Sequence, residues 1–459
     1  MRRRALILIT CLGLAASLWA GDFKLPKYQK ATLKNGLVVY LMEQHEVPLI
    51  AVSAVFPAGS VEEGARYGLA AMTAEALLFG AGSRSKTEIE ETLEALGASY
   101  GSGAGAESAE LSASFLTKDT DTVLPILADI IQNPTFDSEA FDRAKQRRLQ
   151  NLILAKDQPR RVIGSYFTAF LLGDHPYGHP GGGLISTVEA VTVQDAQAFY
   201  KAHYTPQGSA IAVVGDFKAS EMKKRLEKLL GGWTRSGVAP VAVPPVDVQF
   251  TRPRVLLVNK SDATETQFYI GGRGIKRSDP DYTAVQVVNT VLGGRFTSWL
   301  NDELRVNRGL TYGAQSFFMA RRQGGLFLTA SYTRTPKTEE ALDVALEVLD
   351  RLHTQGIDAA TLKSAQNYIK GQYPPDFETT GSLASLLTDM FIYGFDESYI
   401  NDFQKNVDDL TVESVKEIVR KHFPNENLQF VLIGKADEIR DIAAKYGEVT
   451  EKEIQAEGF

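Results

Sequence analysis

The sequence contains a single cysteine, Cys11, which lies within the first twenty residues. If that segment is removed, the chain keeps no thiol, so disulfides, thiolate metal ligands and cysteine nucleophiles are excluded. Its stability then has to come from large apolar cores. Basic residues are also in the minority, with 49 Lys and Arg against 56 Asp and Glu and a net charge of −7. This balance predicts neither a nucleic-acid partner nor an anionic-membrane partner.

The first twenty residues differ from the rest of the chain. A charged start, MRRR, is followed by the uncharged apolar run ALILITCLGLAASLWA. This pattern predicts a secretory signal peptide over residues 1–20, with cleavage near Ala20–Gly21. The alternative is a retained N-terminal anchor. We therefore expect a periplasmic or otherwise exported protein with no membrane contact after signal cleavage.

The chain repeats itself. VTVQDAQAFYKAHYTPQGSAIAVVGD (Val191–Asp216) aligns without a gap on LTVESVKEIVRKHFPNENLQFVLIGK (Leu410–Lys435), and Thr192 matches Thr411. Both segments read as a helix, a turn and a buried apolar strand (Ile211–Val214 and Phe430–Ile433). A period of about 220 residues is too long for a solenoid and indicates duplicated domains.

The segment between the two halves, RSGVAPVAVPPVDVQFTRP at 235–253, is rich in Pro, Gly and Val and predicts an interdomain linker. The two domains are then 21–234 and 254–459. Strands are expected in the first half at Leu37–Met42, Ile50–Pro57 and Glu110–Phe115, and helices near Gly68–Phe79, Lys86–Leu96, Thr122–Ile131 and Ser138–Ala155. Strands and helices follow in blocks, which predicts an α+β fold with two homologous domains, each a mainly antiparallel sheet packed with helices. The acidic, helical-looking end Gly447–Phe459 is expected to be solvated.

Two short motifs suggest chemistry that their context excludes. GASYG (Gly97–Gly101) matches a serine-hydrolase pattern, but a helix precedes Ser99 and a strand follows, the reverse of a nucleophile elbow. YGSGAG leads into a strand, whereas a phosphate-binding loop opens a helix. Both glycine-rich motifs therefore predict a turn between a helix and a strand.

The histidines do not form a recognisable metal site. His175 and His179 are four apart, but Pro176 and Pro180 forbid the helix on which that spacing would chelate a metal. We expect a structured loop there. His203 and His422, at matching repeat positions, are expected to cap the last carbonyls of two helices.

The second half contains LGGRFTSWLNDELRVNRGLTYGAQSFF (Leu292–Phe318), which has the richest set of polar side chains. A helix is expected from Thr297 to Val306, with Gly309 at its C-terminal cap, and LTYGAQSFF then reads as a strand. Arg305 would leave the last turn of that helix, and Tyr312 would lie on the returning strand.

Arg305 and Tyr312 can therefore converge. A guanidinium and a phenol together are good hydrogen-bond donors to a carbonyl or a developing oxyanion. The alternative is that Arg305 pairs with Glu303 or another neighbour and that Tyr312 belongs to the core. The residues by themselves leave both interpretations open.

Nearly the whole chain after residue 20 resembles the pitrilysin/insulinase-type zinc peptidases, in particular the bacterial half-size subunits related to mitochondrial processing peptidase. The resemblance is carried by ATLKNGLVVYLMEQHEVPLIAVSAVFPAGSVEEGARYGLAAMTAEALLFGAGSRS, HPYGHP, FYKAHYTPQGSAIAVVGDF and LNDELRVNRGLTYGAQS. It implies two similar α+β domains joined by a linker, and two such chains facing each other around a chamber.

In active members the helix after GLA carries His-x-x-Glu-His, which supplies two zinc ligands and a general base. A third, acidic ligand comes from a later helix. The matching positions in this sequence are Ala71, Met72, Thr73, Ala74 and Glu75, followed by Gln150 and Asn151. The resemblance therefore implies a degenerate zinc site with no metal and no cofactor bound by this chain, which should not hydrolyse peptides alone.

Leu304–Arg305 and Gly309–Tyr312 match the family's Arg/Tyr pair, which contacts the substrate backbone and stabilises the tetrahedral intermediate. The resemblance thus implies a non-catalytic subunit that completes the site of a homologous partner carrying His-x-x-Glu-His, zinc and a bound peptide substrate. The alternative is a catalytically inert scaffold or peptide-binding protein of the same fold. An autonomous hydrolase has no support, because the sequence offers no ligand set or triad.

Overall fold

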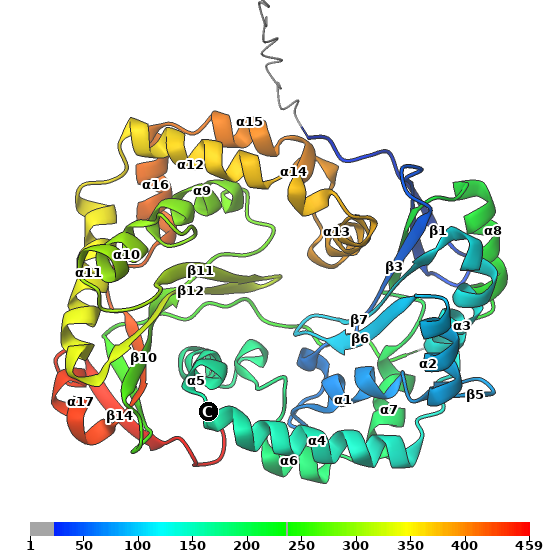
Figure 1. The fold of residues 1–459 in the computed structure, drawn as a ribbon, viewed down its shortest axis with the longest axis horizontal. Helices are drawn as coiled ribbons and strands as arrows, with labels where there is room; N and C mark the ends of the chain where they lie inside the picture. Colours follow the sequence, from blue (N-terminus) through cyan, green and yellow to red (C-terminus); the bar gives the residue numbers. More distant parts are fainter. Residues whose placement is uncertain (1–22, 236) are drawn as a thin grey trace, which may run out of the picture.

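The computed structural model describes residues 23–235 and 237–459, which form two six-stranded sheets packed with helices (Figure 1). In order across the first sheet, the strands are β1 (Gln29–Thr32), β2 (Val38–Glu43), β8 (Ala210–Gly215), β3 (Leu49–Phe56), β7 (Ala109–Leu116) and β6 (Ser99–Ala104). Across the second sheet they are β11 (Gln315–Arg321), β12 (Gly324–Arg334), β10 (Glu265–Arg273), β13 (Gln429–Gly434), β9 (Arg254–Asn259) and β14 (Glu448–Glu453). A small hairpin, β4 (Gly80–Ala81) and β5 (Arg84–Ser85), stands apart.

Most strand pairs in the two sheets are antiparallel. The parallel pairs among the described strands are β2/β8, β13/β9 and β14/β9. Every residue of β8 and β13 is buried, as expected for strands that read as continuous apolar runs. The predicted α+β fold with two mainly antiparallel sheets is confirmed.

The helices follow the expected blocks. In the first half they are α1 (Leu69–Ala76), α2 (Lys86–Ala95), α3 (Thr120–Gln132), α4 (Ser138–Lys156), α5 (Pro159–Leu172), α6 (Ile185–Ala190), α7 (Val193–His203) and α8 (Ala219–Leu230). In the second half they are α9 (Tyr282–Leu292), α10 (Trp299–Asn301), α11 (Thr338–Thr354), α12 (Ala359–Gln372), α13 (Thr380–Tyr393), α14 (Glu397–Asn401), α15 (Phe403–Asp408), α16 (Val412–His422) and α17 (Ala436–Ala443). The aligned residues Thr192 and Thr411 both cap their helices, with hydroxyls that accept from the backbone N–H groups of Asp195 at 3.1 Å and Ser414 at 3.2 Å.

The two halves exchange a helix. α13, from the second half, packs on β3 and β8 of the first sheet, and Ser53 Oγ lies 3.0 Å from Thr388 Oγ1. α5, from the first half, packs on β10 and β13 of the second sheet, where the rings of Phe167 and Tyr269 lie 5.8 Å apart (Figure 1). Because a sheet face must be covered to stay dry, each half completes the core of the other.

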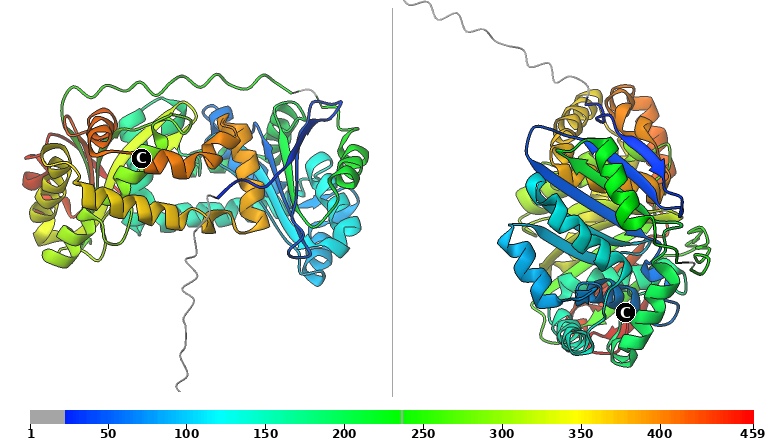
Figure 2. Two further views of the ribbon diagram at one scale, coloured as in Figure 1. Left: turned by 90° about the horizontal axis from the view of Figure 1, so that it is seen from above. Right: turned by 90° about the vertical axis from the view of Figure 1, so that its right-hand side faces the viewer.

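The segment 235–253 contains no helix or strand among its described residues. It runs along one side of the molecule from the first half to the second (Figure 2). Hydrogen bonds attach it to both halves: among them, Val241 N donates to the Glu62 carboxylate at 3.0 Å, and Val246 N donates to Gln323 O at 2.8 Å.

The expectation of a helical C-terminal end was wrong, whereas the expected solvation holds for all residues from 447 to 459 except the buried Ile454. β14 pairs in parallel with β9, and Ile454 after it is buried and accepts a hydrogen bond from Tyr166 OH at 3.2 Å. Ser186 N also donates to Glu457 Oε1 at 2.9 Å, so the end of the chain contacts the first half. Its charged residues suit an edge strand as well as a helix, and the free edge of β9 decided between them.

Within residues 23–235 and 237–459, no helix combines the length and apolarity needed to span a bilayer. The signal peptide expected over residues 1–20 lies outside the described residues.

Candidate functional site

Two glycines at the end of α9, Gly293 and Gly294, allow close packing at the start of the segment 292–318. A Cβ on Gly293 would lie 2.2 Å from the backbone nitrogen of Ser316, so only glycine allows β11 to pass this closely. Asn289 Nδ2 donates to Ser316 O at 2.8 Å and holds the same contact. The end of α9 and the start of β11 are therefore held together.

The helix predicted from Thr297 to Val306 is instead one α turn, α10, followed by a π-helix over Asp302–Asn307. It ends as expected at Gly309, which has φ +59°, and Leu310 N donates back to Leu304 O at 2.8 Å. Sequence periodicity did not distinguish the wider π turn from an α turn. π-helical turns occur frequently at functional sites.

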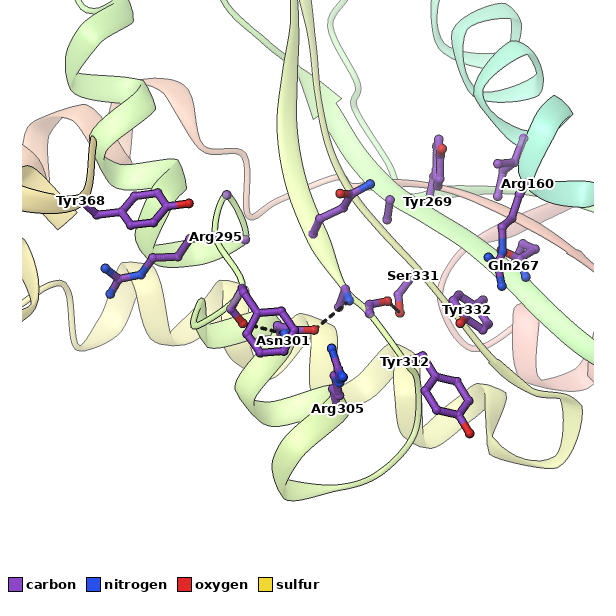
Figure 3. Close-up of a pocket in the computed structure, with 18 residues that line it drawn as sticks. Arg160, Gln267, Tyr269, Arg295, Asn301, Arg305, Tyr312, Ser331, Tyr332 and Tyr368 are labelled. Atoms are coloured by element: carbon purple, nitrogen blue, oxygen red, sulfur yellow. Dashed lines mark hydrogen bonds between the residues drawn. The ribbon is translucent and has the colours of Figure 1, made fainter. Parts of the chain in front are cut away.

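Arg305 and Tyr312 line one cavity of about 620 Å³ (Figure 3). The predicted convergence is therefore present, although Tyr312 lies in a bend before β11 and not on a strand. The Thr311 hydroxyl causes this difference, because it accepts a hydrogen bond from Gly313 N at 3.2 Å and delays the strand until Gln315.

The alternative roles considered for this pair do not match the structure. Arg305 forms no ion pair with Glu303 or with any other described residue, and its guanidinium stacks 4.6 Å from the centre of the Phe296 ring. The side chain of Tyr312 is 82% exposed, so it is not a core residue. Both side chains can therefore donate hydrogen bonds to a molecule in the cavity.

Asn301 positions the two walls of this cavity and was not identified from the sequence. Its side chain is buried, donates to Phe296 O at 2.6 Å, and accepts from Ala314 N at 3.4 Å. It thus ties the loop before α10 to the bend that carries Tyr312 (Figure 3).

One wall of the cavity comes from the other half of the chain. Arg160 and Ile163, on α5, lie across from Tyr332 on β12, and Arg160 stacks 4.1 Å above that ring. No sequence signal indicated this, because the repeat does not reveal the exchange of α5. The full lining is Arg160, Ile163, Gln267, Tyr269, Gly293, Gly294, Arg295, Phe296, Asn301, Arg305, Tyr312, Gly313, Ala314, Gln315, Ala330, Ser331, Tyr332 and Tyr368.

The α1 helix, where the resemblance places the degenerate zinc positions, is held by a buried carboxylate. Glu63 accepts hydrogen bonds from Gly68 N at 3.1 Å and Ala70 N at 2.9 Å, which are free donors at the start of the helix. Burial raises the pKa of Glu63 to about 7. Ala74 is fully buried and Ala71 partly so, and neither offers a donor atom to a metal.

Glu75 is engaged by two arginines of α4. Arg147 Nη2 donates to Oε1 at 2.6 Å and Arg148 Nη2 donates to Oε2 at 3.2 Å. Gln150 and Asn151 lie one turn further along α4 and are exposed. A zinc site needs at least three good protein ligands. These positions do not fit one, because they hold two alanines, a carboxylate paired with two guanidinium groups, and two exposed amides.

His175 and His179 do not converge on a common metal position. His175 Nε2 lies 3.0 Å from Pro244 O, whereas the ring of His179 packs 4.9 Å from that of Tyr67, across the short 3₁₀ turn Pro176–Gly178. The expected structured loop is present and the two rings have different partners.

The expected capping of helix carbonyls by His203 and His422 was wrong. His203 Nδ1 lies 3.7 Å from Glu62 Oε2, and His422 Nε2 lies 2.8 Å from Asp281 Oδ2. Asp279, Asp281 and His422 are the one group of three potential ligands close enough for a metal among the described residues. Lys421 Nζ also lies 2.5 Å from Asp281 Oδ2, so a cationic group already neutralises that carboxylate.

Comparison with known proteins identifies the family. A model of the insulinase family (peptidase family M16) matches residues 38–179, and a model of the peptidase M16 inactive domain matches residues 190–369. A protein described as a zinc protease of Mycobacterium leprae is 26% identical over 85% of this chain and 88% of its own length. A probable mitochondrial-processing peptidase subunit beta of Arabidopsis thaliana is 22% identical over 91% of this chain and 80% of its own.

Solved structures agree with this family at the level of the fold. The crystal structure of a peptidase M16 inactive domain from Pseudomonas fluorescens superposes with a TM-score of 0.83 and 26% identity, covering 89% of this chain and 98% of that one. A protease from Helicobacter pylori has the same fold, with a TM-score of 0.81 and 20% identity over 89% and 100% of the two chains. This chain belongs to the pitrilysin/insulinase family, peptidase family M16.

Proposed function

We propose that this chain is the zinc-less subunit of an exported heterodimeric zinc metallopeptidase. It supplies Arg305 and Tyr312 to bind and polarise a peptide in the active site of a homologous partner that carries His-x-x-Glu-His and the zinc. The observation that supports this most directly is the presence of both side chains in one cavity, free of carboxylate partners in the described chain.

The chemistry of the pair suits peptide cleavage. A guanidinium and a phenolic hydroxyl donate hydrogen bonds to a carbonyl oxygen, and both bonds strengthen as negative charge develops on that oxygen. Stacking on Phe296 limits the rotamers of Arg305, so less side-chain entropy is lost when a substrate binds.

The proposal that the metal belongs to the partner is supported by the donor set around α1. Ala71 and Ala74 have no donor atoms, and both oxygens of Glu75 accept from guanidinium groups. A heterodimer with the zinc helix in one chain and the Arg/Tyr pair in the other would separate two functions that a single M16 active site needs together.

The first measurement is hydrolysis of a quenched-fluorescent peptide in the presence of zinc. The chain would be assayed alone and together with an M16 protein that copurifies from the native host. We expect turnover only in the mixture, with a loss of roughly 100- to 1000-fold for Arg305→Ala or Tyr312→Phe. The matched control is Arg308→Ala, which removes an exposed arginine of the same segment that pairs with Glu347 at 3.6 Å and does not line the cavity.

Each outcome discriminates between the candidate functions. Turnover by the chain alone would contradict the assignment of Ala71, Ala74 and Glu75 as a degenerate site. Peptide binding without turnover in any mixture would favour an inert scaffold or peptide-binding protein of the same fold. Equal losses for Arg305→Ala and Arg308→Ala would remove Arg305 from the site.

A further inference from the structure

The cavity that holds Arg305 and Tyr312 has a charge opposite to that of the whole chain. Its lining includes three arginines, Arg160, Arg295 and Arg305, and no aspartate or glutamate, whereas the sequence has 56 acidic against 49 basic residues. Concentrating like charges in one concave surface costs electrostatic free energy unless an anion is bound there for part of the time.

None of these three guanidinium groups forms an ion pair with a described residue. Each lies against an aromatic ring, and for Arg160 and Arg305 this stacking leaves the edge of the guanidinium open for a carboxylate. In addition, Arg295 Nε is buried without a hydrogen-bond partner in the described chain, and Arg295 Nη1 donates to Ser364 Oγ at 3.0 Å. The stacking distances from guanidinium carbon to ring centre are 4.1 Å for Arg160 on Tyr332, 4.6 Å for Arg305 on Phe296 and 5.8 Å for Arg295 on Tyr368.

The three arginines are spread along the cavity. Figure 3 shows Arg295 near Tyr368 at one side, Arg160 near Gln267 at the other, and Arg305 between them. Arg160 lies in the first turn of α5, which begins at Pro159, so the positive end of that helix dipole adds to the potential at this side. A single small anion would not reach both sides, whereas an extended chain with several carboxylates would.

We propose that this cavity selects peptides with acidic side chains on one or both sides of the backbone segment held by Arg305 and Tyr312. Arg160 and Arg295 are the residues that determine this preference. The inference rests on the proposed function, because it takes the occupant of the cavity to be a peptide. The tyrosine rings and the side-chain amides of Gln267 and Gln315 suit a peptide, because they offer stacking surfaces and hydrogen bonds to main-chain groups.

The test measures binding of fluorescent peptides to the chain alone by fluorescence anisotropy. All peptides have blocked ends, so carboxylates occur only on side chains, and the acidic peptide differs from its control by Glu→Gln substitution alone. We expect the wild-type chain to bind the acidic peptide about tenfold more tightly at low salt, and to lose most of that preference at high salt. Arg160→Gln and Arg295→Gln should each lower the preference by about threefold.

Arg143→Gln is the matched control, because it removes one exposed arginine of α4, paired with Glu139 at 3.4 Å, that does not line the cavity. It should keep the wild-type preference. Equal affinity of the wild-type chain for the two peptides would overturn the inference, and this comparison needs no variant to fold. An equal drop for Arg143→Gln and Arg160→Gln would also overturn it, because the preference would then come from net charge.

The binding result and the turnover assay can fail separately. Acidic preference by the chain alone, without turnover in any mixture, supports this inference and contradicts the proposed function. Turnover with a partner, without acidic preference in either assay, retains the proposed function and overturns this inference.

Discussion

Arg147 Nη2 lies 2.6 Å from Glu75 Oε1, and this ion pair joins α4 to α1 at a position where active relatives are expected to hold a zinc ligand. Because Arg148 also bonds Glu75 and is only 22% exposed, loss of the carboxylate leaves a largely buried guanidinium with its hydrogen bond to Gly182 O but without a carboxylate partner. We expect Glu75→Gln to lower the free energy of unfolding by about 1 kcal/mol, as judged by urea denaturation. The control is Glu139→Gln, which removes an exposed ion pair with Arg143 within α4. It should change the free energy of unfolding by less than about 0.5 kcal/mol.

Zinc binding provides a separate prediction about the same residue. If Glu75 belongs to a structural ion pair, zinc titration of the purified chain should be the same for wild type and Glu75→Gln. Isothermal calorimetry with zinc measures this directly. A weaker zinc isotherm in the variant would place a metal at α1 and contradict the proposed division of roles.

Glu63 should make stability depend on pH in an unusual direction. Burial raises its pKa to about 7 from an ordinary value of 4.5, so between these two pH values the folded chain binds a proton that the unfolded chain has released. The contribution of Glu63 to the free energy of unfolding is therefore greatest below about pH 4.5. It falls by roughly 3 kcal/mol as the pH rises to about 7.

The Glu63→Gln variant isolates this effect, because its amide oxygen still accepts from the start of α1 and does not titrate in this range. Relative to wild type, the variant should gain up to about 3 kcal/mol in unfolding free energy between about pH 4 and pH 8. A constant difference between the two chains across this range would show that Glu63 has an ordinary pKa.

The exchanged helix α13 should make the two halves unfold together. Leu387 is fully buried, in the same hydrophobic core as Ala51 of β3 and Val288 of α9. We expect Leu387→Ala to cost about 2–5 kcal/mol and to shift a single thermal transition in calorimetry. Leu154→Ala, at a position 54% exposed, should have little effect. Two separated transitions in the Leu387→Ala chain would show that each half is stable without the other.

Removal of residues 448–459 should expose the outer edge of β9. A free edge strand offers unpaired backbone groups to other chains, so the shortened protein should self-associate. Light scattering after size exclusion would measure the change. A monodisperse shortened chain of unchanged stability would show that β14 is dispensable.

Much of the fold followed from local patterns. The apolar runs 211–214 and 430–433 became the buried strands β8 and β13, and Thr192 and Thr411 cap the helices that precede them. These features depend on residues within a few positions of one another, so their signals survive in the sequence. The acidic end was misassigned because its conformation depends on pairing with β9, about 190 residues earlier in the chain.

The candidate site divides in the same way. The sequence by itself determined that Arg305 and Tyr312 lie on one short segment that turns back at Gly309, so that they can converge, and that Ala71 and Ala74 offer no ligands. Only the tertiary structure decided that Arg160 lines the same cavity and that Glu75 pairs with Arg147 and Arg148. It also decided that α5 and α13 each pack on the sheet of the other half. These contacts join residues far apart in the chain, and their free energy comes from burying two sheet faces at once, which no local pattern encodes.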